Sequence, residues 1–192
     1  MEYNTYNIYT NLERFIATRE WSKCSDLLDK DEFDVQMRAN GYTTITGYDR
    51  NERLSSIVLT NNVSNIANHT KEFTSMSKSV KGVIILISNK EITSLVKIYA
   101  DLKNRIVYSY TFSKFIIDMT KAPLVPKHRL LPKDEAEHIL NNVLYKEPRN
   151  LPSISILDTQ VVWLGANFGD IIEITRLSES TGLSLAYRHV CL

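Results

Sequence analysis

Cysteine, glycine and long apolar runs are all scarce in this sequence. Its only two cysteines, Cys24 and Cys191, lie near opposite ends and form no CxxC pair, which excludes a disulfide framework and a zinc site built on paired cysteines. We therefore expect a reducing, intracellular setting. The longest apolar run spans residues 83–87, whereas a transmembrane helix needs roughly 20 apolar residues. Residues 1–15 lack the cationic and apolar parts of a signal peptide, so no membrane contact is expected.

An excess of either charge is also missing. Lysine and arginine number 23 against 22 aspartates and glutamates, a formal net charge of +1. A strongly basic nucleic-acid binder is therefore not indicated, and any contact with DNA must be local or shared with a partner that neutralises most of the phosphates. A chain of 192 residues, of which 43% are apolar, is typical of one or two domains that bury a core without staples.

The motifs of phosphate-binding loops and of hydrolase nucleophiles are absent, as the total of 6 glycines already suggests. The histidines have no two members at the i, i+4 spacing of a helical metal site. They are His69, His128, His138 and His189. The single carboxylate of Asp170 in the ANFGD stretch cannot hold Mg²⁺ for phosphoryl transfer, so that stretch is predicted as a turn between strands. We expect no metal and no cofactor.

One pair of residues supports an alternative, enzymatic hypothesis. Asp101 and Lys103 have the D-x-K spacing of metal-dependent nucleases, in which carboxylates hold Mg²⁺ and the lysine supports the attacking water. No second acidic residue is placed to share the metal, and the pair falls at the end of an amphipathic segment. The competing interpretation is an exposed, charged end of a helix.

In the first 120 residues, hydrophobic spacing predicts helices over residues 8–18, 21–28 and 91–102. Runs rich in β-branched residues predict strands over residues 41–45, 54–60, 82–88, 104–112 and 115–119. The polar segment 61–81 is predicted as a loop with a short helix around residues 69–77, and the acidic segment 29–34 as a helix start or a solvated face. The order strand, helix, strand indicates an α/β or α+β domain.

All five prolines fall within residues 123–152, and this cluster marks a change of domain. After it, Asp134 and Glu135 suit the first turn of a helix, where the helix dipole favours negative charge. Strands are predicted over residues 160–164, 170–176 and 185–190. We predict an α+β fold with an N-terminal α/β domain (1–122) and a small C-terminal domain (123–192) that has a helix and a mostly antiparallel sheet.

The segment LVPKH at residues 124–128, an acidic helix start, the LPSI stretch at residues 151–154 and the ending up to residue 192 match a known pattern in order. They resemble the C-terminal domain of the fifth subunit shared by the eukaryotic nuclear RNA polymerases, and the small archaeal polymerase subunit that is its counterpart. The residues that match the motif, or that the resemblance makes candidates for an interface, are Leu124, Val125, Pro126, Lys127, His128, Asp158, Trp163, Gly165, Gly169, Arg176, Gly182, Tyr187 and Arg188. The chain departs from the family at Thr159, at Leu183 and in a less basic turn over residues 166–169.

The resemblance implies a non-catalytic subunit without catalytic residues of its own. Its C-terminal domain would dock on the largest polymerase subunit, and its N-terminal domain would belong to the lower jaw beside downstream DNA. Trp163, Tyr187 and Arg188 are interface candidates because aromatic and arginine side chains dominate hot spots, although Trp163 equally suits a core position.

The divergent N-terminal half resembles the versions carried by large DNA viruses, which implies the host cytoplasm and the virion. A cellular version would act in the nucleus. A third hypothesis is a free-standing transcription regulator that uses the same C-terminal domain.

Overall fold

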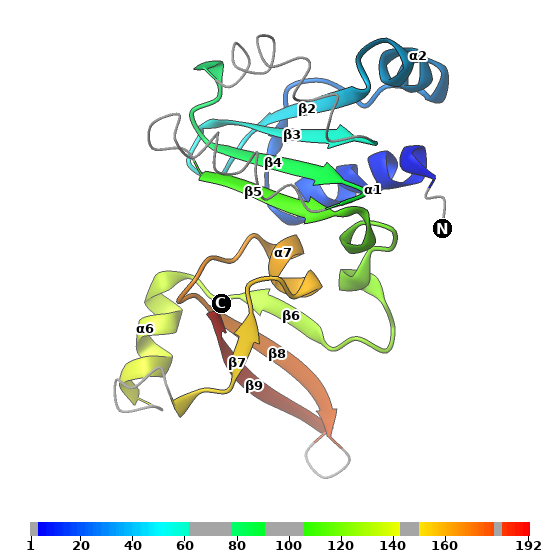
Figure 1. Ribbon diagram of the computed structural model, residues 1–192. Coiled ribbons are helices and arrows are strands. Elements are labelled where there is room, and N and C mark those ends of the chain that lie inside the picture. The colour runs from blue at the N-terminus through cyan, green and yellow to red at the C-terminus, as the bar shows by residue number, and fades with distance from the viewer. Residues whose placement is uncertain (1–3, 62–77, 91–105, 143–149, 179–181) are drawn as a thin grey trace. The chain divides into compact units, whose positions relative to one another are not determined.

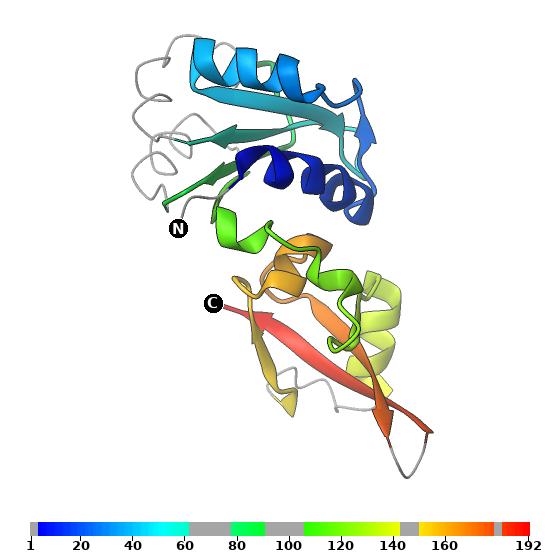
Figure 2. The same ribbon diagram turned by 90° about the vertical axis from the view of Figure 1, so that its right-hand side faces the viewer.

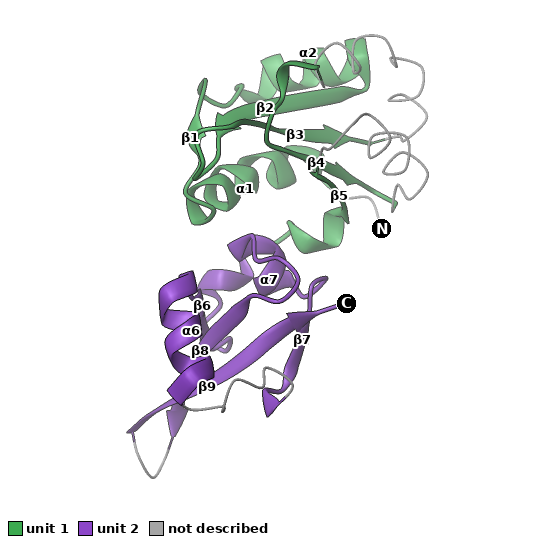
Figure 3. Cartoon of the chain, turned by 90° about the vertical axis from the view of Figure 1, so that its left-hand side faces the viewer, with its two compact units in different colours: residues 1–117 green, residues 118–192 purple. Residues whose placement is uncertain are grey.

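In the computed structural model, the described residues are 4–61, 78–90, 106–142, 150–178 and 182–192. The chain divides into two compact units, residues 1–117 and 118–192, and each is described by itself (Figure 3). Each unit combines helices with one sheet, so the predicted α+β class is confirmed. The functional division into domains 1–122 and 123–192 stays a prediction.

The first unit is built on a sheet with the strand order β1-β2-β3-β4-β5 (Figure 1). Its strands are β1 (Ser22–Lys23), β2 (Tyr42–Tyr48), β3 (Leu54–Thr60), β4 (Val83–Ser88) and β5 (Ile106–Thr111). The pairs β1–β2 and β2–β3 are antiparallel, whereas β3–β4 and β4–β5 are parallel. Parallel neighbours need a crossover connection, in agreement with the predicted order strand, helix, strand. The predicted helices over residues 69–77 and 91–102 lie outside the described residues.

Among the described residues, two α-helices accompany this sheet, α1 (Thr5–Thr18) and α2 (Lys30–Asn40). They contact each other through aromatic rings, with the centroids of Tyr9 and Phe33 4.8 Å apart (the two blue helices of Figure 2). The N-terminus of α2 is a capping box, in which Asp29 accepts from the Glu32 amide and the Glu32 carboxylate accepts from the Asp29 amide. The acidic segment is therefore a helix start, as one of its two interpretations held.

The helix predicted over residues 21–28 is wrong. The backbone reverses at Glu20, whose φ is 57°, and Cys24 donates from its amide to the Thr46 carbonyl (3.1 Å). Pairing with β2 therefore takes the backbone groups that a helix would use, and the helix begins only at the Asp29 cap.

The strand predicted over residues 115–119 is also wrong. The 3₁₀ helix Phe112–Lys114 precedes this segment, and its last residue already begins a second 3₁₀ helix, Met119–Lys121. The side-chain amide of Asn11 donates to the carbonyls of Phe115 and Ile116, at 3.0 and 2.9 Å. A side chain of α1 thus occupies carbonyls that a neighbouring strand would otherwise bind.

The second unit contains a sheet with the order β6-β8-β9-β7. Its elements are β6 (Lys127–Leu130), α6 (Lys133–Asn142), β7 (Ser153–Ser155), α7 (Thr159–Leu164), β8 (Ile171–Ser178) and β9 (Gly182–Cys191). Only the β7–β9 pair is parallel among the described strands of this sheet, so the predicted mostly antiparallel sheet is present.

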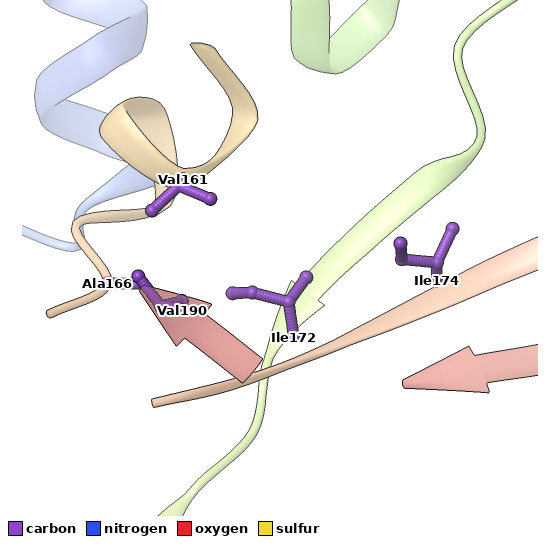
Figure 4. Packing of buried hydrophobic residues seen from close by; sticks show 5 residues of the cluster. All are labelled: Val161, Ala166, Ile172, Ile174 and Val190. Atoms are coloured by element: carbon purple, nitrogen blue, oxygen red, sulfur yellow. The ribbon is translucent and has the colours of Figure 1, made fainter. Parts of the chain in front are cut away.

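The described helices α6 and α7 cover opposite faces of this sheet. Ile172 and Ile174 project from β8 toward Val161 of α7 and the following Ala166, as Figure 4 shows. Ile171 points to the other face, where it packs with residues of α6. Successive strand residues alternate between faces, so this one strand supplies both apolar clusters.

The strand predicted over residues 160–164 is in fact the helix α7. Asp158 caps its N-terminus by accepting from the Gln160 amide (2.8 Å), and Gly165 ends it with a φ of 71°. A short apolar run is compatible with a buried strand or a buried helix, and here the two end residues decide between them.

Candidate functional site

Four of the family-motif residues form caps and turns in the second unit. Asp158 and Gly165 bound α7, while Gly169 and Gly182 adopt φ values of 88° and 75°. Gly169 also donates from its amide to the Val190 carbonyl (2.9 Å), which joins the turn before β8 to β9. These residues fix the shape of the unit, because a side chain at a positive φ is strained.

The LVPKH segment leads into β6. Leu124 is 97% exposed, and Pro126 and Lys127 are exposed as well. His128 is partly buried, and its Nδ1 lies 2.7 Å from the carbonyl oxygen of Pro126. The segment therefore presents an apolar side chain and a cation to solvent from a short, hydrogen-bonded turn.

The three interface candidates from the sequence differ in accessibility. Trp163 is fully buried, which is the core interpretation, so its indole is not available on the surface. Arg188 is partly buried and donates to the Ser153 carbonyl (2.9 Å), which ties β9 to β7. Tyr187 is partly buried on the α6 face, whereas Arg176 of β8 is exposed. Among the described residues, the motif positions thus do not gather into one cluster.

An ionic network that the sequence did not predict lies beside Tyr187. Arg129 of β6 donates to both carboxylate oxygens of Glu135, at 3.2 and 2.8 Å, and to Glu173 of β8 at 3.0 Å. The Tyr187 hydroxyl donates to the other Glu173 oxygen at 3.4 Å. Hydrogen bonds to the two carboxylates raise the pKa of Arg129, while burial and then the Glu173 charge raise the pKa of Tyr187.

This network borders a cavity of about 300 Å³ between α6 and the sheet. Its lining includes Leu131, Asp134, Glu135, His138, Glu173 and Tyr187. Three carboxylates line the cavity, and Arg129 pairs with only two of them, Glu135 and Glu173, so the rim is acidic. The cavity suits a cationic or amphipathic partner group better than an anionic one.

Among the described residues, no group of three or more His, Cys, Asp or Glu is arranged to hold a metal ion. Asp170, predicted in a turn, accepts from the Asn167 amide (2.6 Å) in a turn between α7 and β8. Asp101 and Lys103 of the nuclease hypothesis lie outside the described residues.

Both cysteines are free thiols, Cys24 exposed and Cys191 partly buried. Of the helices in the described ranges, none combines the length and apolarity needed to cross a membrane.

Comparison with known proteins decides the family. The family model described as "RNA polymerase Rpb5, C-terminal domain" matches residues 117–190. The "DNA-directed RNA polymerase subunit Rpo5" of the archaeon Sulfolobus acidocaldarius is 44% identical over 78 residues, which cover 41% of this chain and 92% of that protein. The chain belongs to the Rpb5 family of RNA polymerase subunits.

Similarity to an Rpb5 family member of a virus extends over nearly the whole chain. The "DNA-directed RNA polymerase RPB5 homolog" of African swine fever virus (isolate Warthog/Namibia/Wart80/1980) is 26% identical over 197 residues, with 95% of each chain covered. The Rpo5 subunit of Nitrosopumilus maritimus is 44% identical over 66 residues, which cover 34% of this chain and 78% of that subunit. The predicted resemblance is therefore confirmed, including its viral form.

Proposed function

We propose that this chain is a non-catalytic subunit of a viral DNA-directed RNA polymerase and docks on the largest subunit through residues 123–192. The family match carries this proposal, because it spans residues 117–190 and so coincides with the second compact unit, 118–192. In addition, a match of only 78 residues covers 92% of an archaeal protein that is named as a polymerase subunit. A domain of this size is sufficient to form nearly all of such a subunit.

Within that domain, the accessible motif residues are the proposed contacts. They are Leu124, Pro126, Lys127 and Arg176, all exposed, with Tyr187 partly exposed beside the acidic cavity. Asp158 and the three glycines act indirectly by holding the turns, and Arg188 does so by joining β9 to β7. Val125 donates from its amide to the Ala122 carbonyl (3.0 Å) in the turn before β6, and His128 of β6 contacts the Pro126 carbonyl through its Nδ1.

For residues 1–122 we propose a jaw-like role near downstream DNA. The similarity to the viral relative covers 95% of this chain, so it includes the N-terminal unit, which is not an unrelated addition. With a net charge of +1 for the whole chain, contact with DNA is weak or indirect and depends on cationic surfaces of the other subunits. The proposed sites of action are the host cytoplasm and the virion.

Affinity purification from the source tests the docking proposal. The tagged full chain is expected to recover the large polymerase subunits in stoichiometric amounts and at moderate salt. Recovery of the chain alone, as a monomer in extract, would instead favour the free-standing regulator. A tagged unrelated protein of similar charge and size serves as the control for nonspecific binding.

A further inference from the structure

The β8–β9 hairpin continues past the strands that flank it. β6 pairs with β8 only from Ile172 to Thr175, and β7 pairs with β9 only from His189 to Cys191. The β8–β9 pairing itself extends further, to Ser178 and Gly182. In Figure 3 this part of the hairpin reaches beyond the end of α6. Among the described strands, it is therefore a two-stranded ribbon, a structure that is marginally stable in water without a covering layer.

The two faces of this ribbon differ sharply in polarity. Leu177 lies opposite Leu183, and Leu185 lies opposite Thr175, so the three leucines share one face. Their exposed fractions are 91%, 66% and 56%, respectively. The other face carries the cross-strand pair of Arg176 and Ser184. We call Leu177, Leu183 and Leu185 the leucine face.

The leucine face continues the surface that α6 covers. Ile171 and Tyr187 point to the α6 side and pack with its residues, and the leucines follow them at even spacing along the same strands. The acidic cavity is lined by Asp134 and Glu135 of α6 and by Glu173 and Tyr187, which lie on the same strand faces as the leucines. An apolar strip and an acidic hollow are thus adjacent on one side of the unit.

We infer that the leucine face and the acidic cavity together bind one segment of a large polymerase subunit. That segment carries apolar side chains for the leucines and a lysine or arginine for the cavity, where Arg129 pairs with Glu135 and Glu173 but not with Asp134. This inference rests on the proposed function and adds to its docking contact three leucines that are not among the motif residues. Burial of the leucines would also supply the layer that the ribbon lacks.

The test compares full-length variants for binding to the purified large subunits of the source polymerase. Leu177→Ser combined with Leu183→Ser is expected to weaken binding at least about tenfold, because exposed apolar side chains at the centre of an interface carry much of its affinity. Leu177→Ser alone, at a side chain that is 91% exposed and so outside the core, is expected to weaken it about threefold. The control Val35→Ser removes a side chain of similar exposure (64%) from the first unit and leaves binding unchanged.

The charge part of the inference has its own variant. Asp134→Asn keeps the shape of the α6 terminus and removes one cavity charge, so it is expected to weaken binding and to reduce its dependence on salt. Unchanged affinity and unchanged salt dependence in this variant would overturn the cationic part of the proposed segment.

The outcomes separate the inference from the proposed function. If the wild-type chain binds no large subunit, the proposed function itself is wrong. If the wild type and both leucine variants bind equally, the docking function stands and the leucine face is not its contact. If the wild type instead forms a dimer that the leucine variants abolish, without a change in polymerase binding, the occupant is a second copy and the inference is overturned.

Discussion

Arg129 connects three elements through two carboxylates. It bonds Glu135 at the start of α6 and Glu173 in the middle of β8, although it stands on β6. Its own side chain is 44% exposed, whereas that of Glu173 is only 14% exposed, so loss of the arginine would leave a largely buried carboxylate without this partner. Arg129 therefore stabilises the fold mainly by neutralising the Glu173 carboxylate, and less by its own burial.

The Arg129→Gln variant is expected to lower the free energy of unfolding by about 1 kcal/mol. Urea denaturation measures this loss, and the difference from wild type is expected to shrink as salt is raised, because salt screens the exposed part of the pair. The matched control, Arg176→Gln, changes an exposed arginine of the same sheet and is expected to have little effect. Equal losses in the two variants would contradict the proposed role of the network.

At the scale of elements, the sequence predicted those with clear periodicity. The helix over residues 8–18 and the strands over residues 54–60, 82–88 and 170–176 correspond to α1, β3, β4 and β8. The predicted secondary structure was wrong where a capping residue or a distant contact determines the backbone conformation. Residues 160–164 form a helix between the caps Asp158 and Gly165. Near residue 115, the side chain of Asn11 binds a backbone carbonyl that a strand would use. Apolar runs show that a segment is buried, but not which backbone geometry its caps impose.

Asp158→Ala tests the capping account of α7. A helix of six residues has little stability of its own, so loss of the bond to the Gln160 amide is expected to cost about 1 kcal/mol of unfolding free energy. Asp158→Asn keeps an acceptor at the same position and is expected to retain most of the stability. Chemical denaturation of the two variants distinguishes the roles, and equal destabilisation by alanine and asparagine would show that the carboxylate charge, rather than the cap, is what matters.

At the scale of the whole molecule, the family could be predicted from ordered motifs, whereas the surface geometry could not. Arg129 and Glu173 are 44 positions apart in sequence, and only the register between β6 and β8 brings them together. The leucine face likewise depends on the pairing of Leu177 with Leu183 across the hairpin. Motif residues such as Asp158 and Gly165 mark the family because they fix the fold, so recognition of the family left the contact surface open.

Cross-linking mass spectrometry on the assembled polymerase tests the central claim, which is docking through the C-terminal domain. The exposed lysines Lys127 and Lys133 lie at the start of β6 and of α6, beside the proposed contact surface. The account predicts lysine-specific cross-links from both to the largest polymerase subunit. An intact polymerase in which Lys127 and Lys133 cross-link only to other subunits, while Lys30 of the first unit cross-links to the largest, would contradict it.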